Sequence, residues 1–89
     1  MVESETEIVN RLGLHARAAA KLVHAAGAFQ SRVTLAKDGE EVDAKSILGL
    51  LLLAAGQGSR VKVRCEGADE EEAMHAVTQL IANRFEEES

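Results

Sequence analysis

His15 is the residue whose type and position could most directly do chemistry in this chain. It stands between a loop that contains Gly13 and a stretch with helical spacing, and Ala16 and Arg17 follow it directly. The first N–H groups of a helix have no partner within the helix, and the helix dipole adds about half a positive charge there. An anion is therefore stabilised at this point, and a guanidinium adds paired donors for phosphate oxygens.

The imidazole of His15 would be the nucleophile at this position. The helix dipole and Arg17 both oppose imidazolium, so they favour the neutral ring, whose bare nitrogen can attack. We predict that His15 accepts a phosphoryl group, which the backbone N–H groups of Ala16 and Arg17 and the Arg17 side chain then hold. The structural alternative is that His15 only caps the helix or packs on the loop.

Composition excludes several other classes of function. The 89 residues are 46% hydrophobic and only 2% aromatic, which fits one globular domain over residues 1–89 with few surfaces for base stacking. The net charge of -5 argues against nucleic acid as a partner. Cys65 is the only cysteine and the three histidines are scattered, so we expect neither a metal site nor a cofactor.

The chain also lacks the signals of export or membrane insertion. Its first residues are acidic, without the basic and apolar regions of a secretory signal. The longest apolar run, residues 47–55, is well short of the roughly 20 residues that a bilayer requires. We therefore expect a soluble, cytoplasmic protein.

Hydrophobic periodicity predicts the elements that must position His15. Strands are expected at residues 2–9, 32–36, 40–43 and 59–66. Helices are expected at about residues 16–26 with Gly27 as the stop, at 47 to a stop at Gly56 or Gly58, and from 69 onward. This order, β-α-β-β-α-β-α, predicts an α+β fold: a two-layer open-faced sandwich with a four-stranded antiparallel sheet and three helices on one face.

Charges and caps refine this prediction. The outward glutamates of the first strand (Glu3, Glu5 and Glu7) complement the outward bases of the fourth (Arg60, Lys62 and Arg64), which predicts that the two strands are neighbours. Ser46 is expected to cap the second helix, and Asp69 with Glu72 to form a capping box on the third. We expect Cys65 to be buried, His24 and His75 to face solvent, and residues 86–89 to be frayed and solvated.

Two segments carry a resemblance to a known family. The segment NRLGLHARAAA, at residues 10–20, resembles the active-site segment of the HPr family, the histidine-containing phosphocarriers of the bacterial phosphoenolpyruvate:sugar phosphotransferase system. The segment KSILGLLLL, at residues 45–53, is similar to the regulatory-serine segment of that family, and residues 67–70 match the start of its last helix. Ala18 departs from the pattern, because the family usually has proline there, and it predicts a less rigid loop.

The resemblance implies a phosphocarrier that is not itself an enzyme. Such a protein receives phosphate on Nδ1 of His15 from phosphorylated enzyme I, binds it with Arg17, and passes it to a IIA component without a metal. Ser46 would correspond to the serine phosphorylated by HPr kinase/phosphorylase, which would place about -1.5 to -2 charge there.

The second helix also predicts a partner surface. It cannot bury all of its apolar residues, although ordinary core packing should claim at least half of them. Ile47, Leu48 and Leu51 are the candidates for contacts with enzyme I and IIA proteins. Two alternatives stay open: a regulatory binding module controlled at Ser46, and a carrier of the nitrogen-related branch. We expect the carrier to be a monomer, because a relay protein that docks briefly with several partners works well in that state.

Overall fold

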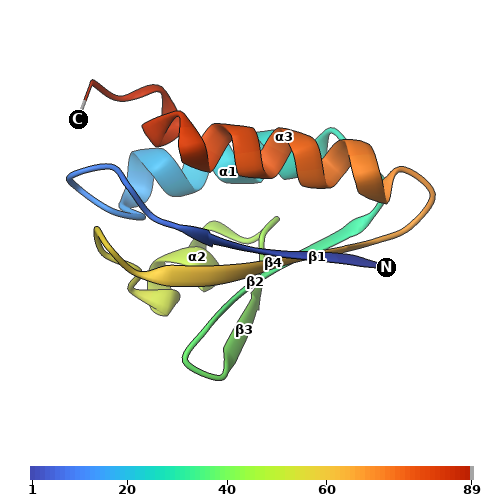
Figure 1. Cartoon of the computed structure of the whole chain (residues 1–89), viewed down its shortest axis with the longest axis horizontal. Helices are drawn as coiled ribbons and strands as arrows, with labels where there is room; N and C mark the ends of the chain where they lie inside the picture. The colour runs from blue at the N-terminus through green and yellow to red at the C-terminus, as the bar shows by residue number, and fades with distance from the viewer. Residues whose placement is uncertain (89) are drawn as a thin grey trace.

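The computed structural model describes residues 1–88, which form the expected order of strands and helices with one short left-handed turn, η1, added (Figure 1). The elements are β1 (Val2–Glu7), α1 (Ala16–Gly27), β2 (Arg32–Lys37), β3 (Glu40–Asp43), α2 (Ile47–Leu53), β4 (Arg60–Glu66), α3 (Glu70–Ala82) and η1 (Arg84–Glu86). The predicted α+β class is therefore confirmed.

The strands pair antiparallel in the order β1-β4-β2-β3. The helices cover one face of this sheet: α1 and α3 lie side by side, and α2 packs against α1 and β3 (Figure 1). Alternate strand residues point into this layer and are buried, among them Val33, Leu35, Val61, Val63 and Cys65. The opposite face of the sheet is left open, as in an open-faced sandwich.

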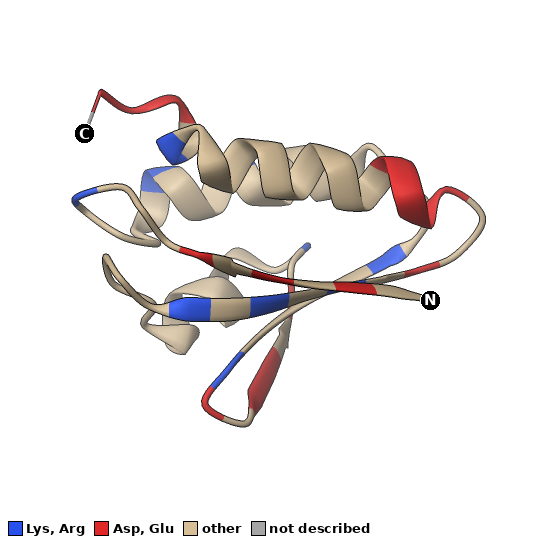
Figure 2. Ribbon diagram, in the orientation of Figure 1, with Lys and Arg blue, Asp and Glu red and all other residues tan. Residues whose placement is uncertain are grey.

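The register of β1 and β4 places acidic and basic residues opposite one another, and in Figure 2 the ribbon of β1 carries red segments where that of β4 carries blue ones. The opposed pairs are Glu3 with Arg64, Glu5 with Lys62, and Glu7 with Arg60. Arg64 Nε lies 2.9 Å from Glu3 Oε2, and Arg60 Nε lies 3.1 Å from Glu5 Oε1. The predicted pairing is confirmed, and because exposed ion pairs contribute little to stability, their main effect is on register.

Two helix ends differ from the sequence prediction. Gly27 is the last residue of α1, and Ala28 caps it. The helix α2 ends at Leu53, and Ala54 turns the chain with a left-handed φ of 55°, so neither Gly56 nor Gly58 closes this helix. The cause is tertiary: the next residue, Ala55, is buried and accepts the Leu14 N–H at 2.8 Å, which forces an early turn.

The predicted capping box at the start of α3 is wrong. The carboxylate of Asp69 makes no bond to its own helix; it accepts the N–H groups of Gln30 and Ser31 at 2.9 Å each, and also the Ser31 hydroxyl. These bonds, the Ser31 hydroxyl foremost, hold the pKa of Asp69 below its usual value. Asp69 thus ties the start of α3 to the connection between α1 and β2. Glu70, not Glu72, reaches back to the Gly67 N–H, at 3.1 Å.

The hydrophobic core lies between the sheet and the helices. It includes Cys65, as predicted, and burial raises the pKa of this thiol. His24 and His75 lie outside the core and are exposed, also as predicted. Phe85 in η1 is fully buried and anchors the end of the described chain in this core. No helix within residues 1–88 combines the length and apolarity needed to cross a membrane.

Candidate functional site

His15 is the N-cap residue of α1. Its backbone is extended, with φ -83° and ψ -180°, and its Nδ1 accepts the N–H of Arg17 at 3.3 Å. Its carbonyl accepts the N–H of Ala19 at 2.8 Å, the first turn of the helix. The structural role weighed from the sequence is therefore present, and it places the imidazole directly over the N-terminus of α1.

The loop before His15 is held in place by Gly13. Gly13 has a φ of +69°, and a Cβ built on it would lie 2.8 Å from the carbonyl oxygen of Ala55. Glycine is required by both the backbone conformation and the close approach. The adjacent bond from Leu14 N–H to Ala55 fixes this loop against the segment that follows α2. In this way the fold brings the loop of His15 and the end of α2 together.

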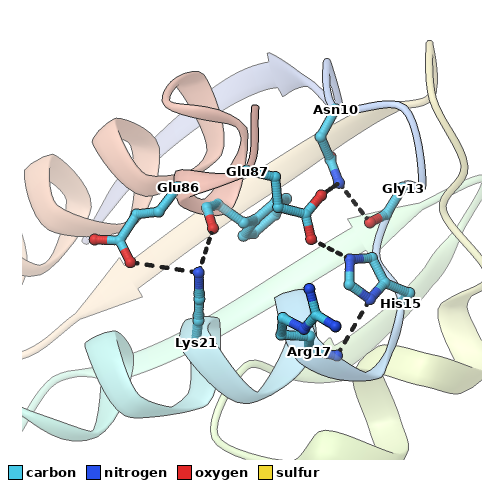
Figure 3. A network of polar contacts seen from close by, with 8 residues as sticks. Asn10, Gly13, His15, Arg17, Lys21, Glu86 and Glu87 are labelled. Carbon is cyan, nitrogen blue, oxygen red and sulfur yellow. Dashed lines mark hydrogen bonds and ion pairs between the residues drawn. The ribbon is translucent and has the colours of Figure 1, made fainter. Parts of the chain in front are cut away.

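The predicted phosphate donors surround the imidazole. The Ala16 N–H donates to no acceptor among residues 1–88, and the Arg17 N–H is engaged only by Nδ1 of His15. In Figure 3 the Arg17 guanidinium lies beside the His15 ring, and it forms no ion pair with the described residues. The His15 side chain keeps 25% of its surface exposed. The ring is thus open to solvent beside three donors.

Sequence reasoning missed one member of the site. Glu87 lies against the ring, where its Oε2 is bonded to Nε2 of His15 and its Oε1 accepts Nδ2 of Asn10 at 2.9 Å (Figure 3). Its side chain is only 12% exposed, so the prediction of a frayed, solvated end is wrong at this residue; Ser89 lies outside the described residues. The sequence signal that could have found it is Phe85, which extends the inner stripe of α3 toward the end of the chain.

The environment of Glu87 favours its carboxylate form. The Asn10 amide is the largest influence holding the pKa of Glu87 below its usual value, and the His15 bond and the charge of Arg17 act in the same direction. Asn10 is fully buried, and its Nδ2 also donates to the Gly13 carbonyl at 2.8 Å. One buried amide therefore braces both the loop and the carboxylate.

Ser46 caps α2, as predicted. Its Oγ accepts the N–H of Gly49 at 3.1 Å, and its backbone is extended. A Cβ on Gly49 would lie 3.3 Å from this oxygen, so the small residue leaves room for the cap.

The apolar surface of α2 is larger than the sequence led us to expect. Only Leu50 and Leu53 are buried, so the core claims fewer than half of its six large apolar residues. The exposed ones are Ile47, Leu48, Leu51 and Leu52, at 43%, 67%, 38% and 69%. The geometric reason is that α2 has just seven residues and presents one narrow side to α1 and the sheet.

Comparison with known proteins identifies the family. Residues 2–83 match the family model described as the PTS HPr component phosphorylation site. This chain belongs to the HPr family. Its members are phosphocarrier proteins of the phosphotransferase system and are not catalysts.

Relatives in the HPr family resemble the chain over its length. The phosphocarrier protein HPr of Cupriavidus necator is 55% identical over 87 residues, 98% of each chain. That of Xylella fastidiosa strain Temecula1 is 53% identical over 89 residues, all of both chains. The crystal structure of HPr-C-His from Thermoanaerobacter tengcongensis superposes with a TM-score of 0.96 at 47% identity and covers both chains fully. An HPr dimer from the same organism gives 0.79 at 47% identity, covering 98% of this chain and 100% of the other.

Proposed function

We propose that this chain accepts a phosphoryl group on Nδ1 of His15 from phosphorylated enzyme I and passes it to a IIA component of the phosphotransferase system. The observation that carries the proposal is the placement of Nδ1 over the N-terminus of α1, within 3.3 Å of the Arg17 N–H. Membership of the HPr family supports the same role.

The transfer uses groups that the site already holds together. The lone pair of Nδ1 attacks phosphorus, the bond from phosphorus to the donor breaks, and its electron pair leaves with the donor. The Arg17 N–H, released from Nδ1, then donates to a phosphoryl oxygen, together with the Ala16 N–H and the Arg17 guanidinium. Passage to the IIA component is the same exchange in the other direction: the bond from phosphorus to Nδ1 breaks, its electron pair returns to Nδ1, and the acceptor of the IIA component forms the new bond to phosphorus.

The exposed face of α2 is the proposed docking surface for both partners. Ile47, Leu48 and Leu51 are large apolar side chains that the fold leaves in contact with solvent. Exposed apolar side chains gathered on one short helix favour association with another protein. A carrier that docks briefly and repeatedly is proposed to be a cytoplasmic monomer; the dimeric HPr of Thermoanaerobacter tengcongensis is the alternative, which sedimentation would reveal.

Ser46 supports a second, regulatory role. Ser46 is partly exposed and directly precedes Ile47, a residue of the proposed docking surface. Phosphorylation by HPr kinase/phosphorylase would add about -1.5 to -2 charge. Such a charge beside an apolar surface would weaken one partner and could recruit another.

Labelling tests the main proposal directly. Incubation with phosphoenolpyruvate and enzyme I should give an acid-labile phosphoprotein whose label maps to His15, and His15→Ala should stay unlabelled. Normal labelling of the alanine variant would remove His15 as the acceptor. Incubation with ATP and an HPr kinase should instead give an acid-stable phosphoester on Ser46, and its absence would remove the regulatory role.

A further inference from the structure

The two ring nitrogens of His15 face partners of opposite hydrogen-bonding character. Nδ1 faces the backbone N–H of Arg17, which can only donate. Nε2 faces Oε2 of Glu87, which in its carboxylate form can only accept. A neutral imidazole carries one proton, and the structure offers a place for it on Nε2 alone.

We propose that Glu87 is a positioning residue for phosphoryl transfer: its carboxylate keeps the His15 proton on Nε2 and so leaves the lone pair on Nδ1. This inference rests on the proposed function of His15 and adds a role for the last turn of the described chain. In the opposite tautomer, a proton on Nδ1 would meet the Arg17 N–H, and a lone pair on Nε2 would meet the carboxylate. Both contacts would be repulsive, so the carboxylate selects the reactive form.

The same contact also offsets charge during the transfer. When the Nδ1 lone pair forms the bond to phosphorus, the proton stays on Nε2 and the ring becomes positively charged. The Glu87 carboxylate then faces a cation in place of a neutral donor. This is the role that a buried aspartate plays toward histidine in serine proteases, where the carboxylate orients the ring and stabilises imidazolium without taking its proton.

The fold holds Glu87 at the ring from several sides. Phe85 is buried in the core two residues earlier, and Lys21 on α1 donates to the Phe85 carbonyl at 2.9 Å. Lys21 Nζ also lies 3.5 Å from Oε1 of Glu86 (Figure 3). Residues 84–86 all have positive φ, between 53° and 65°, a conformation that non-glycine residues adopt only when their surroundings impose it. The turn directs the Glu87 carboxylate back toward the start of α1.

Three variants of the full chain test the inference. Glu87→Ala removes both the acceptor and the charge, and Glu87→Gln keeps an acceptor oxygen without the charge. Glu88→Gln makes the same charge change at an exposed neighbouring side chain and is the matched control. Long-range nitrogen NMR of the ring, at a pH where His15 is neutral, reports which nitrogen holds the proton. The exposed rings of His24 and His75 serve as internal references.

We expect a single Nε2–H tautomer in the parent chain and in Glu88→Gln, and a mixture of tautomers in Glu87→Ala. The rate of phosphoryl transfer from enzyme I should fall about tenfold in Glu87→Ala, the lower end of the effect seen for carboxylates that orient metal-binding histidines. Glu87→Gln should keep the tautomer and transfer at an intermediate rate.

Two results would overturn the inference. The first is a Glu87→Ala variant in which both the tautomer of His15 and the rate of phosphoryl transfer match those of the parent chain. If Glu87→Ala does not fold, a parent-like transfer rate in Glu87→Gln has the same meaning. The other is faster transfer in Glu87→Ala, because the carboxylate would then be obstructing the phosphate. Either result with His15 still labelled would leave the proposed function intact, whereas labelling of His15→Ala would remove both.

Discussion

The side-chain amide of Asn10 donates to the carboxylate of Glu87 at 2.9 Å, across 77 positions of sequence. The same Nδ2 donates to the Gly13 carbonyl at 2.8 Å, so one amide joins the loop before His15 to the end of the described chain. The proposed acceptor is therefore held between the two, with the loop on one side and the carboxylate on the other (Figure 3).

Asn10→Ala should loosen both sides of the site. The buried Gly13 carbonyl loses one of its two donors and keeps the His15 N–H at 2.9 Å. The variant should therefore lose about 0.5 to 1.5 kcal/mol of unfolding free energy, the net contribution of one hydrogen bond. The pKa of Glu87 should rise, because the Asn10 bond is the largest influence that lowers it. Urea unfolding and carboxyl-carbon NMR titration measure the two effects. An unchanged Glu87 titration would contradict the bracing role of Asn10.

Gly13→Ala should destabilise the loop before His15 by about 1 to 3 kcal/mol, the scale of a strained non-glycine backbone. Its positive φ and the approach of the Ala55 oxygen to 2.8 Å both act against a side chain. Gly39→Ala is the matched control. Gly39 has a φ of +85° but open space around it, so only the unfavourable backbone conformation acts against its alanine variant. The melting temperature of Gly13→Ala should therefore be lower than that of Gly39→Ala. Equal melting temperatures would show that the chain around Ala55 moves away from the new Cβ at little cost.

Ser46→Ala should lower the unfolding free energy by about 1 kcal/mol, because the Gly49 N–H loses the oxygen that caps α2. Ser46→Asp should keep most of that stability, since aspartate is also a good N-cap residue, while adding a negative charge. Chemical denaturation of the three proteins measures this order. If Ser46→Ala is as stable as the parent chain, water replaces the hydroxyl and the cap is dispensable.

Leu48→Ser should slow phosphoryl transfer from enzyme I while changing stability by no more than about 0.5 kcal/mol, because Leu48 is 67% exposed and packs little in the free protein. Leu50→Ala on the same helix is the contrast: it is fully buried, and its truncation should cost about 2 to 5 kcal/mol. Transfer rates at several enzyme I concentrations separate docking from chemistry. Parent-like transfer by Leu48→Ser would exclude this residue from the docking surface.

Acid should weaken the fold partly through Asp69. Its pKa in the folded state lies below the usual Asp value of about 3.9. Its contribution is therefore fully present above that value and is lost as the pH falls through the folded pKa. Asp69→Asn should flatten the loss of stability as the pH falls below about 4. Urea midpoints of both proteins across this range test the sign, and parallel curves would show that the Ser31 and Gln30 bonds do not depend on the charge.

Local patterns in the sequence were enough to predict much of the architecture. Alternation along residues 2–9 and 59–66, with the opposed charges of Glu3 and Arg64, was enough to predict which strands are neighbours. Ser46 was recognised as a cap because serine before an apolar run has that role in most sequence contexts. His15 was found in the same way, from its place at a loop and helix junction. Each of these features depends on residues close together in the chain or on one repeated period.

The tertiary structure decided what distant residues do for one another. Asp69 has the spacing of a capping box, yet its carboxylate binds Ser31 because the connection between α1 and β2 brings N–H groups within reach. Glu87 belongs to an acidic end that looks solvated, yet burial of Phe85 turns it back onto His15. A carboxylate binds whichever donors the packed chain places beside it. Sequence periodicity records which face of an element is buried, but it does not record which donors the packing of other elements delivers to that face.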